Sequence, residues 1–217
     1  MLNLRLQKPE SPLKILCLGA HSDDIEIGCG GSVLKLLKEY SNVEVNWVVF
    51  SSTRDRADEA RDSANLFLQD AGRKNIAVKN FRDSFFPYVG AEIKEYFEEI
   101  KKSFSPDVIF THCRNDLHQD HRLVSELTWN TYRNHLILEY EIIKYDGDLG
   151  APNAFIHIDA ETCRKKIDYI MRVFKTQGHR VWFTDDGFAS IMRIRGIESN
   201  APDRFAEAFY SRKLVLQ

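Results

Sequence analysis

Short apolar segments alternate along this chain with longer segments in which apolar side chains recur at helical spacing. The first apolar run, Lys14 to Leu18, is followed by glycine, which is typical of a strand buried on both faces of a parallel sheet. Residues 32–40 then place their apolar side chains on one helical stripe. The pattern therefore predicts a strand, a glycine-rich turn at Gly30–Gly31 and a helix, in that order.

The same alternation extends over the rest of the chain. The further predicted strands are 43–52, 75–81, 106–112, 137–143 and 154–159, and the further predicted helices are 57–72, 90–104, 122–134 and 159–178. Strands that alternate with helices favour a parallel sheet with right-handed crossovers. We therefore predict an α/β protein with a Rossmann-like, open and mostly parallel sheet that carries helices on both faces.

Length and composition limit what the chain can be. Its 217 residues, 43% of them hydrophobic, are enough for one substantial core, so we expect a single domain over residues 1–217. The 30 basic and 32 acidic side chains give a net charge of −2, which favours neither nucleic acid nor an anionic membrane surface as a partner. No run reaches the roughly 20 apolar residues of a transmembrane segment. Four widely spaced cysteines without a CxxC pair favour a reducing compartment, so we expect a cytoplasmic protein.

Two clusters of histidine and aspartate follow two of the predicted strands. His21, Asp23 and Asp24 come after the first strand, and the segment "HCRNDLHQDH" comes at the end of the strand 106–112. The second cluster consists of His112, Asp116, His118, Asp120 and His121. Ligands of open α/β sheets bind outside the carboxyl ends of the strands, where both clusters fall. Because a catalytic zinc typically takes three nitrogen or oxygen ligands and keeps one open position, the two clusters together predict a metal site.

Two other interpretations of these segments stay open at this point. The charged side chains can simply be solvated loop residues, with the glycines serving a tight turn. The segment "GCGGS" can also hold a phosphate through backbone amides at a helix N-terminus, although neighbouring carboxylates disfavour an anion there.

The motifs resemble those of a known family. "GAHSDDIEIGCGGS" resembles the AHPDDE…GG signature of the PIG-L or LmbE-like family of zinc-dependent N-acetylglucosamine-type deacetylases, and "HQDH" is similar to the second, HxxDH-type motif of that family. Further segments resemble the family in the same order along the chain, from about residue 14 to residue 210. These segments are "RADEARDSANLFLQDAG", "FRDSFFP", "FKTQ" and "DRFAEAF".

The resemblance implies a role for five residues. His21, Asp24 and His121 would bind the metal, which is expected to be Zn²⁺, with Fe²⁺ as an alternative in cells. Asp23 would be the general base, and His118 would stabilise the developing oxyanion.

Other side chains near the predicted strand ends are candidates for substrate binding or support. Arg54, with Arg56 beside it, has a guanidinium suited to hydroxyl or phosphate groups of a sugar, and a salt bridge at the start of a helix is an equal alternative. Asp83 can accept hydrogen bonds from sugar hydroxyls or cap a turn. Glu26 can be an extra ligand or a support of its loop, and His112 can orient a ligand or belong to the core.

The function expected from these features is that of a zinc-dependent hydrolase. It would remove the N-acetyl group from an N-acetylated amino sugar or its conjugate, of the N-acetylglucosamine type, and release acetate and a free amine. The expected partner is this small-molecule conjugate, and a homo-oligomer is compatible with the sequence. Two alternatives are a metal-dependent amidase that acts on another N-acyl metabolite and a non-catalytic module that binds a sugar or a metal.

Overall fold

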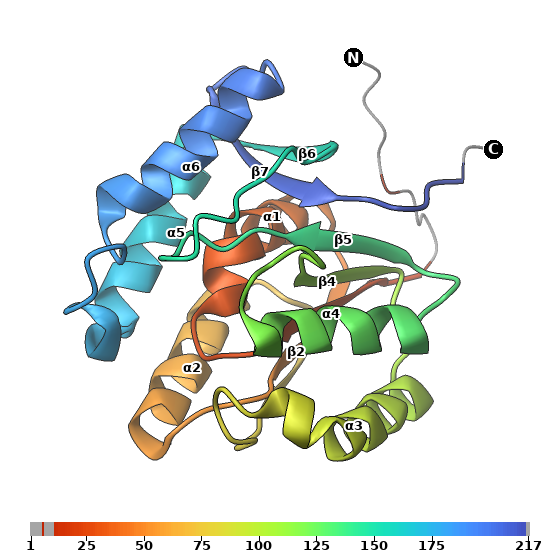
Figure 1. The fold of residues 1–217 in the computed structure, drawn as a ribbon. Coiled ribbons are helices and arrows are strands. Elements are labelled where there is room, and N and C mark those ends of the chain that lie inside the picture. The colour runs from red at the N-terminus through yellow and green to blue at the C-terminus, as the bar shows by residue number, and fades with distance from the viewer. Residues whose placement is uncertain (1–5, 7–10, 216–217) are drawn as a thin grey trace.

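The computed structural model describes residue 6 and residues 11–215, whose arrangement Figure 1 shows. These residues form a sheet with the strands β1 (Leu13–Gly19), β2 (Val43–Val49), β3 (Arg73–Val78), β4 (Val108–His112), β5 (Leu136–Tyr140), β6 (Ala154–Ile158) and β7 (Phe205–Tyr210). The helices are α1 (Asp24–Glu39), α2 (Arg54–Phe67), α3 (Gly90–Ser103), α4 (Gln119–Thr131), α5 (Ala160–Val173) and α6 (Asp185–Glu198), with short 3-10 turns η1 (Phe86–Tyr88) and η2 (Lys175–Gln177).

The strand order of the seven-stranded sheet is β3-β2-β1-β4-β5-β7-β6. The strands β1 to β5 are parallel to their neighbours among themselves, whereas β7 runs antiparallel to both β5 and β6. The predicted α/β fold with a mostly parallel sheet is confirmed. The chain leaves β1 toward β2 and later returns on the other side of β1 as β4, so the order reverses between β1 and β4. A crevice for ligands opens at this kind of reversal in doubly wound folds.

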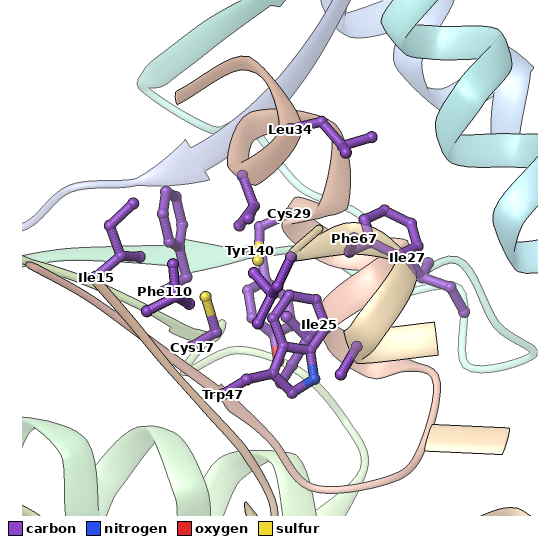
Figure 2. Close-up of a cluster of buried hydrophobic side chains, with 14 of the residues drawn as sticks. Ile15, Cys17, Ile25, Ile27, Cys29, Leu34, Trp47, Phe67, Phe110 and Tyr140 are labelled. Atoms are coloured by element: carbon purple, nitrogen blue, oxygen red, sulfur yellow. The ribbon is translucent and has the colours of Figure 1, made fainter. Parts of the chain in front are cut away.

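Helices cover both faces of the sheet, and β1 contributes apolar side chains to both, because successive side chains of a strand point to opposite sides. Ile15 and Cys17 belong to one core, and Leu16 and Leu18 belong to another. The first core also receives side chains from α1, α2, α5 and α6, including Ile25, Phe67, Ile170 and Phe188. Figure 2 shows part of this core. The second core receives side chains from α3 and α4, including Ile93, Phe97 and Val124.

The prediction for the start of the first helix was wrong. A turn at Gly30–Gly31 followed by a helix from Ser32 was expected, but α1 begins at Asp24 and contains these glycines. Close packing explains their presence, because a Cβ atom on Gly30 would lie 2.6 Å from Cε1 of Phe67 and one on Gly31 would lie 2.9 Å from Oε1 of Glu207. The two glycines let α1 lie close to α2 and to β7, a gain that offsets their low helix propensity.

Two elements near the C-terminus were not predicted. Helix α6 contains two glycines, and its sequence has little amphipathic pattern. Strand β7 carries Glu207 in its middle, and a buried glutamate interrupts the apolar run by which a central strand is recognised.

The last predicted helix, 159–178, is shorter than expected, since α5 ends at Val173 and η2 follows. Among the described residues, no helix has the length and apolar character needed to cross a bilayer.

Candidate metal centre

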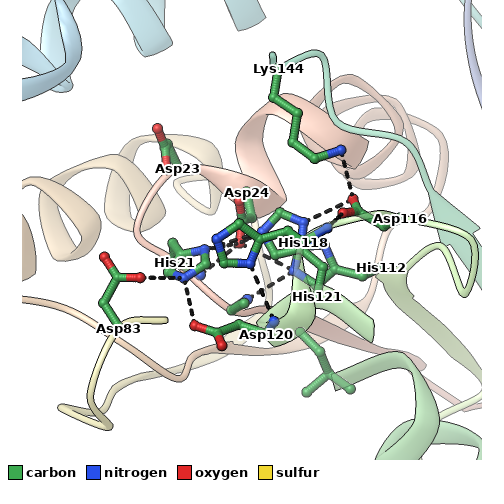
Figure 3. Close-up of polar contacts among 12 residues, drawn as sticks. His21, Asp23, Asp24, Asp83, His112, Asp116, His118, Asp120, His121 and Lys144 are labelled. Atoms are coloured by element: carbon green, nitrogen blue, oxygen red, sulfur yellow. Dashed lines mark hydrogen bonds and ion pairs between the residues drawn. The ribbon is translucent and has the colours of Figure 1, made fainter. Parts of the chain in front are cut away.

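The two histidine–aspartate clusters meet at the reversal point of the sheet. β1 pairs directly with β4, so the segments that follow these two strands start side by side. His21 lies in the short connection after β1, and Asp24 is the first residue of α1. His118 caps the N-terminus of α4, and His121 lies in the first turn of that helix. Figure 3 shows these side chains gathered in one group.

Three ligand-type atoms converge inside this group. The distance from His21 Nδ1 to His121 Nε2 is 3.1 Å, and Asp24 Oδ2 lies 3.4 Å from the first atom and 3.5 Å from the second. Metal–ligand bonds of roughly 2.0–2.1 Å in a tetrahedron separate neighbouring ligand atoms by about 3.3–3.4 Å. The three atoms are therefore spaced like one face of a tetrahedral zinc site, and they can hold a metal of that size.

Carboxylates on the far side of each histidine ring fix its orientation. His121 Nδ1 is 2.9 Å from Asp116 Oδ2. His21 Nε2 lies 3.1 Å from Asp83 Oδ1 and 3.3 Å from Asp120 Oδ2. A ring nitrogen that faces a carboxylate carries the proton, which leaves the lone pair on the other nitrogen. In both rings that other nitrogen is the one in the three-atom group.

Asp120 belongs to the second predicted cluster, but its place in the sequence does not indicate a role for it. It is fully buried, and its two carboxylate oxygens accept hydrogen bonds from the backbone amides of Ser84 (2.6 Å) and Phe86 (3.1 Å). These bonds tie the segment after β3 to α4. Asp120 therefore supports His21 and anchors the loop that carries Asp83.

The electrostatics of the group favour a bound positive charge. Burial opposes ionisation of Asp24, but the neighbouring His121 and His112 hold the pKa of this carboxyl well below its usual range. Burial and the neighbouring His112 lower the pKa of His121 to about 4, so its ring is neutral near pH 7, as a metal ligand must be. Burial opposes the charge on His21 as well, yet hydrogen bonds to Asp120 and other carboxylates raise its pKa well above 6.5. The carboxylates thus attract a proton or a metal cation to this place.

Asp23 stands apart from the three-atom group, as Figure 3 shows. Its Oδ1 accepts a hydrogen bond of 3.0 Å from Arg56 Nη2. Burial raises the pKa of Asp23, and the guanidinium of Arg56 partly opposes this rise. A carboxylate with a raised pKa is a stronger base, and Arg56 holds this one in place.

His118 is half-buried, and its ring lies near those of the two histidines in the group. The ring centroids are 4.9 Å from His21 and 4.6 Å from His121. His118 Nδ1 accepts a hydrogen bond from the backbone amide of Asp120 at 3.2 Å, so the proton of the neutral ring is on Nε2. Burial and the nearby His21 lower the pKa of His118, which favours this neutral form. His118 Nε2–H is therefore available as a donor beside the metal-binding atoms.

His112 supports the group from behind. Its Nε2 accepts a hydrogen bond of 2.9 Å from the backbone amide of Ala20, and its ring stacks on that of His121 with centroids 3.9 Å apart. Because this nitrogen is already occupied, His112 does not have the lone pair that a ligand needs there. Glu26 is fully buried within α1, and burial raises its pKa well above the usual range, so it is suited to a neutral carboxyl group and not to an anionic ligand.

The two predicted substrate residues occupy different places. Asp83 is exposed and contacts His21, whose hydrogen bond and charge keep the pKa of the Asp83 carboxyl below its usual range against the effect of burial. Arg54 is the first residue of α2 and is exposed. The arginine that contacts a site residue is the neighbouring Arg56. The sequence placed both arginines at this sheet end but did not distinguish their partners.

The fold and the site define an α/β protein with a histidine–carboxylate centre at the reversal point of its sheet. Residues 16–132 match the model of the family described as PIG-L, GlcNAc-PI de-N-acetylase. This match covers more than half of the chain, and the protein belongs to the PIG-L family.

The chain is also similar to a curated protein in sequence and to solved structures in fold. The chain is 33% identical over 117 residues to the uncharacterized deacetylase YaiS of Escherichia coli (strain K12), an alignment that covers 51% of this chain and 63% of YaiS, less than two thirds of its length. The N,N'-diacetylchitobiose deacetylase of Pyrococcus horikoshii has a similar fold, with a TM-score of 0.66, 22% identity and coverage of 91% of this chain and 83% of that one. The 4-carboxy-2-hydroxymuconate hydratase GalB of Pseudomonas putida is also similar, with a TM-score of 0.72, 14% identity and coverage of 94% and 98%. Since the two similar folds carry different activities, the reaction must be argued from the site.

Proposed function

We propose that this protein is a metal-dependent deacetylase that hydrolyses the N-acetyl group of an N-acetylated amino sugar or its conjugate, of the N-acetylglucosamine type. The observation that carries the proposal is the convergence of His21 Nδ1, Asp24 Oδ2 and His121 Nε2 within 3.1–3.5 Å of one another. The family described as GlcNAc-PI de-N-acetylase and the names of two relatives support the reaction class. The products are acetate and a free amine.

The metal is proposed to be Zn²⁺, with Fe²⁺ as the alternative in cells. Two imidazole nitrogens and one carboxylate oxygen are a donor set that catalytic zinc sites use, and His21, Asp24 and His121 would supply it. A metal bound there would lower the pKa of a bound water from 15.7 toward about 7 and would polarise the carbonyl of the amide.

Asp23 is the proposed general base. Its carboxylate takes the proton of the water that attacks the acetamide carbonyl, and the same carboxyl then delivers a proton to the departing amine nitrogen. The hydrogen bond from Arg56 keeps the Asp23 carboxylate oriented during both transfers. His118 donates its Nε2–H to the oxygen of the tetrahedral intermediate, a contribution of roughly 3 kcal/mol for one such donor.

Substrate contacts and cellular setting complete the proposal. Asp83 is exposed beside His21 and can accept hydrogen bonds from sugar hydroxyls, while the exposed Arg54 is available to a more distant group of the conjugate. The cytoplasm is the proposed location, and the four buried cysteines support it because none forms a disulfide.

The test combines metal content with product detection. Wild type and His121→Ala are analysed for zinc by plasma mass spectrometry, and new amines and acetate are measured with a panel of N-acetylglucosamine conjugates. We expect about one zinc per chain and amine release in wild type, with both lost in His121→Ala. Asp23→Asn is the matched control, because it should keep the zinc while the rate collapses. Wild type that holds zinc but releases no acetate from any conjugate would contradict the deacetylase proposal.

A further inference from the structure

The connection between β5 and β6, residues 141–153, reaches the segment that precedes α4. Lys144 Nζ lies 3.2 Å from Asp116 Oδ2 and also forms an ion pair with Asp148. The Lys144 side chain is 9% exposed, so both contacts are largely shielded from water. Figure 3 shows Lys144 extending from its loop toward Asp116.

Asp116 links this lysine to both histidines of the "HQDH" segment. Its Oδ2 lies 2.9 Å from His121 Nδ1, and its Oδ1 accepts a hydrogen bond of 2.8 Å from the backbone amide of His118. The same carboxylate therefore sets the ring orientation of one histidine and the backbone position of the other. Lys144 Nζ contacts the same Oδ2 atom that faces His121 Nδ1.

A second contact holds the same two segments together. Asp148 Oδ2 accepts a hydrogen bond of 2.8 Å from the backbone amide of Leu117, the residue directly before His118. Lys144 also contacts Asp148. The lysine therefore connects two carboxylates that accept hydrogen bonds from consecutive backbone amides, those of Leu117 and His118. A buried carboxylate without a cationic partner is costly, so we expect loss of Lys144 to disturb the position of Asp116.

We propose that Lys144 is a positioning residue of the metal centre, which acts through Asp116 to hold the His121 ring with Nδ1 protonated and Nε2 directed at the metal. This inference rests on the metal site of the proposed function. It assigns a role to a loop that lies outside both histidine motifs. Loss of a hydrogen-bond partner behind a metal-bound histidine typically weakens metal affinity 10–100-fold.

The experiment measures zinc affinity by competition with a chromogenic chelator and the melting temperature of the metal-free protein. Lys144→Met should bind zinc about 10–100-fold more weakly than wild type. Lys144→Arg keeps a cation near Asp116 and should stay within a few-fold of wild type, by the same argument. Lys35→Met removes a lysine whose exposed partner is Glu39 on α1, and it should leave zinc affinity unchanged.

The outcomes separate this inference from the deacetylase proposal. Unchanged zinc affinity in Lys144→Met, with only a lower melting temperature, would overturn the positioning role and leave a structural one. Wild type that binds no zinc would overturn both proposals. Wild type that binds zinc without releasing amine would contradict the deacetylase alone, since the affinity comparison does not use activity. Should Lys144→Met fail to fold, Lys144→Gln retains a polar head without the charge, and the same loss of affinity is expected.

Discussion

Asp24 combines burial with an unusual number of imidazole neighbours. Its Oδ2 accepts a hydrogen bond of 2.6 Å from the backbone amide of His21 and lies 3.2 Å from His112 Nε2, besides the two ring nitrogens of the proposed metal site. Donor atoms with lone pairs repel one another at such distances unless a proton or a cation lies between them. The arrangement is therefore unfavourable without a proton or cation between these atoms, which supports the proposed metal site.

His118 differs from the three proposed ligands in a way that can be tested. Its Nδ1 is occupied by the Asp120 amide, so we assign Nε2–H to the oxyanion and not to the metal. His118→Ala should lower the deacetylation rate about 100-fold or more and keep the zinc content. Zinc content and kcat on one batch of protein check this. A loss of zinc that parallels the loss of rate would identify His118 as a ligand.

A buried ion pair outside both histidine motifs, Lys166–Glu207, holds helix α1 to the sheet. Glu207 Oε1 and Oε2 accept hydrogen bonds from the backbone amides of Gly31 (2.8 Å) and Ser32 (2.6 Å), and Lys166 Nζ bonds both Glu207 (2.6 Å) and the carbonyl of Ile27 (2.6 Å). This network explains the glutamate in the middle of β7. It also connects α1, which begins with Asp24, to α5 and β7.

Glu207→Ala should reduce the free energy of unfolding by about 3–5 kcal/mol, because it leaves the Lys166 charge buried without a partner. Urea unfolding at pH 7 measures the change. Glu141→Ala provides a comparison. Glu141 also pairs with a cation, Arg195, but Arg195 has a second carboxylate partner, Glu198, which remains in this variant. A loss below 1 kcal/mol for Glu207→Ala would show that the network is not a main support of α1.

Helix α5 has a cap whose strength depends on pH. Asp159 Oδ1 accepts a hydrogen bond of 2.7 Å from the backbone amide of Thr162. Burial opposes ionisation of Asp159, but this bond lowers the pKa of its carboxyl below 3.8 in the folded protein. A carboxyl group whose pKa is lowered by folding stabilises the folded protein at pH values above its pKa in the unfolded chain. That stabilisation is lost as the pH falls through its pKa in the folded protein.

Asp159→Ala should therefore cost about 1 kcal/mol at pH 7, the usual value of an N-cap. The difference from wild type should shrink as the pH falls below 3.8. Unfolding in urea at a series of pH values gives this difference. A cost that stays constant down to the lowest pH would show that the ionised carboxylate is not what caps α5.

The proposed metal site joins parts of the molecule that are distant in sequence, so metal binding should stabilise the whole chain. Free zinc at 1,000 times the dissociation constant adds about 4 kcal/mol to the free energy of unfolding. For a chain of this size each kcal/mol raises the melting temperature by roughly 2–4 °C, so we expect a rise of about 8–16 °C. Scanning calorimetry of chelator-treated and zinc-loaded protein measures it. An equal rise in His121→Ala would show that zinc binds elsewhere.

The central strands of the parallel part of the sheet were predictable because they are buried on both faces. β1, β2 and β4 are almost wholly buried, and apolar residues predominate in all three, although β2 also contains Glu44 and Asn46. The C-terminal part lacked such a signal. β7 contains the paired glutamate, and α6 has no clear apolar stripe, so their place in the sheet and beside it depends on contacts with distant residues.

The order of residues in the chain was enough to place His21, Asp24 and His121 at one edge of the sheet, because segments that follow parallel strands emerge at the same edge. Their approach depends on the pairing of β1 with β4, which brings His21 and His121, 100 positions apart, to 3.1 Å between ring nitrogens. The contacts of Asp23 with Arg56 and of Asp116 with Lys144 had no periodic or spacing signal. They arise from long-range packing of irregular segments, whose partners are set by the folded backbone and not by local sequence.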